Sequence, residues 1–262
     1  MVLLTSKDLE NIKYILLKTI NTVERITKKK IVDFLEFIYN SKYNNECIGI
    51  IPITSGNGRI NLFSESLHET LQLFNMNSFI TEKTDVSGYY EAIKKNANII
   101  LMADDNNFIA FNTKNKKISN NNNATGKIYS KILIHSKTET FDDKEVLVIG
   151  LGNVGIPAID TFLSENYSVY IYDKNKILMN ETIKNYPKLK AYYPSLNKKF
   201  NKIFEATPSE NTIKEYMIKK NTIVSTPGIP RAISKELEKK YDISLVMEPL
   251  GIGTIGMIYE VL

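Results

Sequence analysis

The chain has 262 residues, of which 43% are hydrophobic and 24% charged, a composition typical of a globular protein with a sizeable core. The net charge of +5 comes from scattered lysines whose longest unbroken run is Lys28–Lys30, which disfavours a nucleic-acid partner. The single cysteine excludes an intrachain disulfide and fits a reducing cytoplasm, no apolar stretch reaches membrane-spanning length, and charged residues near the N-terminus exclude a secretion signal.

The N-terminal segment predicts an amphipathic helix. Apolar residues recur at helical spacing from Leu9 to Ile26, and Thr5 or Ser6 can cap a helix that ends near Thr27. The default role of such an apolar stripe is packing onto its own domain. A second helix is predicted at 31–39.

Helices and strands then alternate through the first half of the chain. Strands are predicted at 47–53, 78–81, 99–103 and 108–111, and helices at 64–74, 89–95 and about 125–136, with a loop at 119–123. Helices between strands favour a mainly parallel sheet. Ligands of such sheets bind beyond the carboxyl ends of the strands, where TSGNGR, TDVSG and ADDNN stand in this sequence. Asp104 and Asp105 are therefore candidate acids, although adjacent aspartates after a strand also commonly turn the chain.

The second half opens on a strand at 145–149 followed by G-x-G-x-x-G and a helix at about 153–165. Gly150 permits the tight turn, Gly152 lets backbone approach a pyrophosphate, and Gly155 allows close packing of the helix. The helix start, with Asn153 and Val154, offers N–H groups to the phosphates. Asp173 ends the next strand, at 168–172, and is expected to bind the ribose diol, which favours NAD over NADP.

Three later strands, at 202–205, 222–225 and 244–247, each lead into a short segment rich in proline and small residues: EATP, STPG and EPLG. Such segments would let the nicotinamide half of the cofactor approach the backbone, although proline and glycine also mark ordinary turns. The candidate cofactor contacts are Ala206, Thr207, Pro208, Thr226 and Pro227. Glu205 and Glu248 are further carboxylates at strand ends, and no histidine or cysteine cluster has metal-binding spacing.

These patterns predict an α/β protein with an N-terminal α/β domain and a C-terminal Rossmann-type doubly wound parallel sheet. The polar residues 137–144 predict the boundary, which gives an N-terminal α/β domain with its leading helix at 1–142 and a dinucleotide-binding domain at 143–262. A cleft is expected between them.

The chain also resembles a known family over nearly its whole length. The stretches LLTSKDLENI, PITSGNG, FSESL, DVSGYYEA, IILMADDN, KEVLVIGLGNVG, IFEATP, STPGIP and EPLGIGT are similar to the pyrrolysine-forming dehydrogenases of the PylD family. This resemblance implies NAD-dependent oxidation of the terminal amine of 3-methyl-D-ornithyl-N6-L-lysine. Ammonia is then released, and the ring closes to give pyrrolysine.

The resemblance also implies roles for individual residues. Asp104 is the expected base or iminium stabiliser and Glu248 the alternative, because an ammonium must lose a proton before hydride can leave. Residues expected to bind the isopeptide substrate are Ser55, Gly56, Asn57, Asn120 and Asn121, with Leu4 as the apolar tip of a lid helix. Four consecutive asparagines leave the register of the Asn120–Asn123 segment open.

Two other functions fit the same residues. One is an NAD-dependent amine or amino-acid dehydrogenase with another substrate, and the other is a non-catalytic NAD sensor. The acid at position 104 favours an enzyme over a sensor. The expected partners are the small isopeptide substrate and NAD, with no metal, and a homodimer is left open.

Overall fold

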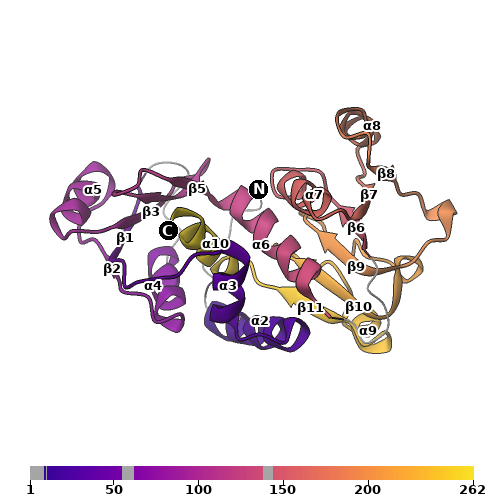
Figure 1. Ribbon diagram of the computed structural model, residues 1–262, viewed down its shortest axis with the longest axis horizontal. Helices are drawn as coiled ribbons and strands as arrows, with labels where there is room; N and C mark the ends of the chain where they lie inside the picture. Colours follow the sequence, from indigo (N-terminus) through magenta and orange to yellow (C-terminus); the bar gives the residue numbers. More distant parts are fainter. Residues whose placement is uncertain (1–8, 10, 55–61, 138–143) are drawn as a thin grey trace. The chain divides into compact units, whose positions relative to one another are not determined.

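The computed structural model describes residues 9, 11–54, 62–137 and 144–262 (Figure 1). The chain divides into two compact units. The five-stranded unit comprises the described parts of residues 3–18, 30–125 and 250–262, and the six-stranded unit comprises residues 19–29 and the described parts of 126–249. Each unit is therefore built from segments that are far apart in the sequence.

The five-stranded unit has a mixed sheet in the order β2-β1-β3-β4-β5. Strands β1 (Ile48–Ile51), β2 (Ser78–Ile80) and β3 (Ile99–Ala103) are parallel, and β4 (Phe108–Asn112) and β5 (Ile118–Asn120) continue the sheet in antiparallel pairing. Helices α3 (Ile31–Tyr39), α4 (Phe63–Leu73) and α5 (Asp85–Lys94) also belong to this unit. The predicted α/β alternation is confirmed, and the antiparallel hairpin is what makes the sheet only partly parallel.

The last helix, α10 (Gly251–Val261), completes the five-stranded unit. All but one of its eleven residues are buried, and it packs against α3, α4, β4 and β5 (Figure 1). The side-chain amides of Asn112 and Asn115 both donate to the carbonyl of Val261, at 2.9 and 2.8 Å. A helix that is apolar on all sides is stable only when it is enclosed in this way.

Helix α2 (Ile12–Thr27) confirms the long N-terminal helix from Ile12 onward. Its apolar stripe is buried, with Leu16 and Val23 fully inaccessible to solvent. This burial favours the packing role for the described part of the helix over a detachable lid, because removing it would expose core surface. The lid tip at Leu4 lies outside the described residues.

Replacing Leu16 with alanine tests this packing role. The Leu16 methyl groups lie 2.9 and 3.1 Å from the place that a Cβ on Gly251 would take, so the truncation leaves a cavity in a tightly packed position. We expect Leu16→Ala to lower the free energy of unfolding by about 2–5 kcal/mol in urea denaturation. Leu17→Ala, at a 43% exposed position of the same helix, should change it by less than about 1 kcal/mol. Equal effects of the two variants would argue for a lid.

The six-stranded unit has an all-parallel sheet in the order β8-β7-β6-β9-β10-β11. Its strands are β6 (Glu145–Ile149), β7 (Ser168–Tyr172), β8 (Lys190–Ala191), β9 (Phe200–Glu205), β10 (Ile218–Thr226) and β11 (Ser244–Met247). Numbered within the unit, this order is 3-2-1-4-5-6, the arrangement of the dinucleotide-binding fold. The predicted Rossmann-type sheet is confirmed.

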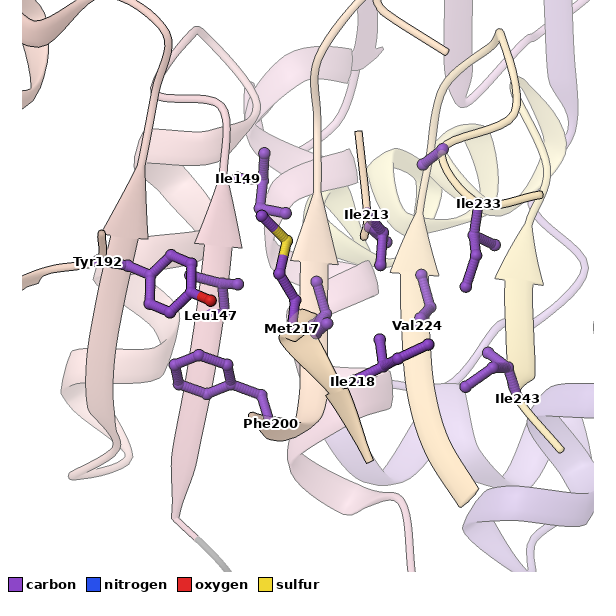
Figure 2. Packing of buried hydrophobic residues seen from close by; sticks show 12 residues of the cluster. Leu147, Ile149, Tyr192, Phe200, Ile213, Met217, Ile218, Val224, Ile233 and Ile243 are labelled. Atoms are coloured by element: carbon purple, nitrogen blue, oxygen red, sulfur yellow. The ribbon is translucent and has the colours of Figure 1, made fainter. Parts of the chain in front are cut away.

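Helices α7 (Gly155–Ser164), α8 (Lys176–Asn185) and α9 (Lys235–Lys240), with the short turns η1 (Pro194–Leu196) and η2 (Glu215–Met217), connect these strands. One face of the sheet carries an apolar cluster. Figure 2 shows Leu147, Ile149 and Val224 gathered there with Met217 from η2. This cluster fixes β6, β9 and β10 relative to one another, and so fixes the loops at their carboxyl ends.

Two segments expected to be loops belong largely to helices instead. The TDVSG segment forms the start of α5, which begins at Asp85 rather than at residue 89. Residues 119–123 were expected to form a loop, but β5 runs to Asn120 and α6 (Asn121–His135) begins at the next residue. The Asn120 side-chain oxygen accepts from the backbone N–H of Asn122 at 3.0 Å, and the Thr125 hydroxyl donates to the Asn121 side chain at 3.2 Å. Asparagine at a helix start bonds locally in this way, so a run that reads as a loop becomes a strand-to-helix junction.

Candidate active site

The reversal of strand order in the six-stranded sheet lies between β6 and β9. Ligands of open α/β sheets bind at this kind of switch point. Here the loop after β6 holds the three glycines, and the loop after β9 holds the EATP segment. The backbone N–H of Ala206 donates to the carbonyl of Ile149 at 2.8 Å, which joins the two loops at their origin.

The three glycines have distinct structural reasons. Gly150 has a φ of +93°, and a Cβ there would lie 2.7 Å from the carbonyl oxygen of Ala206. A Cβ on Gly155 would overlap the carbonyl oxygen of Gly150, so the start of α7 can approach the turn only with glycine. A Cβ on Gly152 would meet no atom within 4 Å. Nothing in the described protein therefore demands glycine at position 152, and the space beside it can receive a ligand such as a pyrophosphate.

Helix α7 begins at Gly155, two residues later than expected, so Asn153 and Val154 belong to the preceding turn. The N-cap residue, Val154, supplies no side-chain hydrogen bond to the helix. The N–H of Ile156 donates to the Gly152 carbonyl at 3.1 Å, and Pro157 has no N–H. The positive end of the helix dipole is therefore the feature of this helix start that favours a bound anion.

Asp173 follows β7, as the sequence predicted. Its Oδ2 accepts from the backbone N–H of Leu151 at 3.0 Å, and its Oδ1 accepts from the N–H of Asn175 at 2.8 Å. The carboxylate therefore ties the glycine loop to the end of β7. Each carboxylate oxygen can accept more than one hydrogen bond, so this arrangement is compatible with a ribose hydroxyl as a further donor.

The EATP and STPG segments meet on one buried carboxylate. Glu205, the last residue of β9, is 1% exposed, and it accepts hydrogen bonds from Thr207, Thr212 and Thr226. Burial raises the pKa of the Glu205 carboxyl, and the hydrogen bonds from the threonines oppose that rise. Of the predicted cofactor residues, Thr207 and Thr226 are thus held together, while Ala206 and Pro208 flank Thr207 and Pro227 follows Thr226.

Glu248 follows β11 and is 1% exposed. The hydroxyl of Tyr129, in α6, donates to the Glu248 carbonyl, and the hydroxyl of Thr19 donates to the Met247 carbonyl at 2.8 Å. Burial, with a smaller contribution from the Glu248 charge, raises the pKa of Tyr129 well above its usual value. Two helices far away in the sequence therefore fix the backbone from which Glu248 projects.

Asp104 has a different environment, in the hairpin between β3 and β4. Its Oδ1 accepts from the backbone N–H groups of Asn106 and Asn107, at 2.8 and 2.7 Å, and its own N–H donates to the Asn107 carbonyl at 2.8 Å. Both of these backbone N–H groups therefore donate to the same side-chain oxygen of Asp104, and the Asp104 side chain is exposed. Asp105 is half-buried. The proposed substrate residues Ser55, Gly56 and Asn57 lie outside the described residues.

Sequence reasoning missed Tyr129, Thr19 and Thr212, which hold the strand ends from other segments and carry no local pattern that marks them. Within the described ranges, no group of three or more histidine, cysteine or acidic side chains could hold a metal ion. Over the same ranges, no helix combines the length and the apolar character that a bilayer crossing requires.

Comparison with known proteins identifies the family. The chain is 46% identical over 262 residues to a curated pyrrolysine synthase of Methanosarcina acetivorans, with all of both chains covered. It is equally similar, at 46%, to that of Methanosarcina barkeri, with all of this chain and 98% of the relative covered. The chain belongs to the pyrrolysine synthase (PylD) family. The resemblance seen in the sequence is therefore confirmed, and membership assigns the chain to the enzymes of pyrrolysine biosynthesis.

The other comparisons agree with this pyrrolysine synthase family. Residues 4–119 match the family described as the N-terminal domain of pyrrolysine biosynthesis protein PylD. Among solved structures, shikimate 5-dehydrogenase from Thermus thermophilus, in complex with NADP(H) and shikimate, superposes with a TM-score of 0.51 at 10% identity, covering 83% of this chain and 94% of that chain. At this identity the likeness supports the fold alone.

Proposed function

We propose that the protein oxidises the terminal amine of 3-methyl-D-ornithyl-N6-L-lysine with NAD, releases ammonia and closes the ring to pyrrolysine. The observation that carries the proposal is the full-length 46% identity to two pyrrolysine synthases. The glycine loop with its open space at Gly152 supports a dinucleotide cofactor. In this proposal residues 143–262 bind the nucleotide, and residues 1–142 bind the substrate.

The cofactor site comprises the glycine loop, Asp173 and the EATP and STPG segments. NAD, when bound there, supplies the acceptor for the hydride. The glycine loop and the positive end of the α7 dipole bind the phosphates, and Asp173 orients the ribose through its carboxylate. The remaining surface of the cofactor site has no bulky side chains, so the reacting half of the cofactor can lie close to the backbone. It is formed by Ala206, Thr207, Pro208, Thr226 and Pro227.

The substrate ammonium carries no free electron pair, so a base must remove one proton before the carbon can release hydride. Asp104 is the proposed base, and Glu248 is the alternative. Once the carboxylate has passed that proton on to water, its restored negative charge stabilises the iminium that forms as hydride leaves. Water then converts the iminium to an aldehyde with loss of ammonia. The ornithine α-amine attacks that aldehyde and loses water, a step that is fast because both groups belong to one molecule.

The direct test is incubation of the purified protein with NAD and the synthetic isopeptide. The proposal expects a rise in NADH absorbance, equimolar ammonia, and a product with the mass of pyrrolysine. NAD reduction that occurs only with other amines would support a different amine dehydrogenase. NAD binding without any turnover would support a sensor.

Asp173 should determine the choice between NAD and NADP. Asp173→Ala removes an acceptor for the ribose diol and a charge that repels a 2′-phosphate, so NAD affinity should fall by roughly tenfold while NADP affinity rises or stays constant. Titration calorimetry with both nucleotides measures the two affinities.

The matched variant for this test is Asp173→Asn. It keeps a carbonyl oxygen for the N–H of Leu151 or Asn175 and removes only the charge. Asp173→Asn should narrow the preference for NAD over NADP, and it should lower the affinity for NAD less than Asp173→Ala does. If neither variant changes the preference, Asp173 does not bind the ribose.

A further inference from the structure

Glu205 lies at the switch point of the six-stranded sheet. It ends β9 and pairs in register with Ile149, the residue immediately before the glycine loop. Because side chains alternate along a strand, Glu205 points to the same face of the sheet as Ile203, a member of the apolar cluster, and it is almost completely buried. Burying a carboxylate destabilises a fold unless hydrogen bonds offset the loss of hydration. The hydrogen-bond partners of Glu205 therefore indicate its structural role.

Those partners come from three separate segments. Oε1 accepts from the backbone N–H of Thr207 at 3.1 Å, from the Thr207 hydroxyl, and from the Thr212 hydroxyl at 2.9 Å. Oε2 accepts from the Thr226 hydroxyl at 3.2 Å. One side chain therefore joins the EATP turn, the segment that follows it, and the end of β10.

The glycine loop depends on the same arrangement. The methyl carbon of Thr207 lies 2.8 Å from the place that a Cβ on Gly150 would take. The orientation of Thr207, which Glu205 fixes through two hydrogen bonds, thus shapes the surface against which the first glycine turns. A shift at Glu205 would move both loops that flank the switch point.

We propose that Glu205 is a positioning residue for the dinucleotide, which holds the loops after β6, β9 and β10 in the conformation that binds it. The inference rests on the proposed function in that the cofactor is NAD. It assigns to Glu205 no contact with substrate and no proton transfer. Its effect on NAD affinity passes through the threonines that it binds.

Two variants test this role, and both replace a side chain by one of nearly the same shape. Glu205→Gln puts an amide NH2, which cannot accept from threonine, in place of one carboxylate oxygen. Thr212→Val removes one donor to Glu205, and Thr212 is not itself among the residues proposed to contact NAD. Thr182→Val is the control, because Thr182 is a buried threonine in α8 whose hydroxyl donates to the Leu178 carbonyl of its own helix, at 2.8 Å.

The measurement is the Kd for NAD by titration calorimetry, at a temperature where thermal melts show each variant to be folded. We expect a Kd about tenfold higher for Glu205→Gln, a few-fold higher for Thr212→Val, and unchanged for Thr182→Val. The double variant Glu205→Gln/Thr212→Val should raise the Kd for NAD by less than the product of the two single fold-changes, because both substitutions act on one hydrogen-bond network.

A folded Glu205→Gln with the wild-type Kd would overturn the proposal, and so would additive effects of the two substitutions. If Glu205→Gln does not fold, the test rests on Thr212→Val. A Kd for NAD in Thr212→Val equal to that of the wild type would then reject the positioning role. The wild-type titration reports separately on the proposed function. If the wild-type protein does not bind NAD, the assignment of the cofactor fails, whatever the variants do.

Discussion

Gly152→Ala should leave the melting temperature of the protein almost unchanged and weaken NAD binding by about 10–100-fold. Apart from its two chain neighbours, a methyl group at this position meets no protein atom within 4 Å, so the fold has no reason to resist it. It would occupy the space proposed for the pyrophosphate and hold the phosphates away from the backbone amides. The magnitude corresponds to the cost of about 1–3 kcal/mol for overpacking a close contact.

The matched variant is Gly155→Ala, because a methyl group there would overlap the backbone carbonyl of Gly150. It should lower the free energy of unfolding by about 1–3 kcal/mol or more, and NAD binding should be lost together with the packing of α7. Urea denaturation and calorimetric titration of both variants provide the test. Unchanged NAD affinity in Gly152→Ala would mean that the phosphates do not bind beside this glycine.

Asp104→Asn should reduce turnover of the isopeptide by about 10²–10⁴-fold, the usual contribution of a general base. The hairpin geometry lets this substitution remove the charge of Asp104 without removing the hydrogen-bond acceptor that closes the turn. Asparagine keeps an oxygen for the N–H groups of Asn106 and Asn107, so the turn should persist while the charge disappears. Thermal melts and the NAD affinity should therefore match those of the wild type.

Asp105→Asn is the matched control for this test and should have a milder effect, because Asp105 is half-buried in the same turn whereas the Asp104 side chain is exposed. Steady-state kinetics of both variants would distinguish them. An inactive Asp105→Asn beside an active Asp104→Asn would move the role by one residue. Activity in both would make Glu248 the base to test, with Glu248→Gln.

The glycine loop could be predicted from the sequence because its determinants are local. The run from Glu145 to Gly155 combines a buried strand, a turn that requires φ > 0 and a helix start, each with a short-range pattern. The site residues around Glu205 could not be predicted as a group, because Thr226 is brought to it only by the pairing of β9 with β10. No spacing rule in the sequence reports that pairing.

Two local patterns favour the wrong structure. The asparagines after Ser119 are typical of loops, but here they pair in β5 and begin α6. The segment GIGTIG after Leu250 is rich in glycine, which disfavours helix in water, yet it forms most of the first two turns of α10. Tertiary packing outweighs propensity there, since Gly251 abuts Leu16 and Thr70 and a larger residue would not fit.

The burial of α10 has a consequence for the order of events during synthesis. The ribosome makes residues 30–125 early, but the helix that covers β4 and β5 emerges only after all of the six-stranded unit has been translated. Until then the nascent five-stranded sheet exposes the apolar surface that α10 later covers, a state that is open to aggregation or chaperone binding. The six-stranded unit should therefore become protease-resistant first on stalled ribosomes, and release of residues 251–261 should be what protects the earlier sheet.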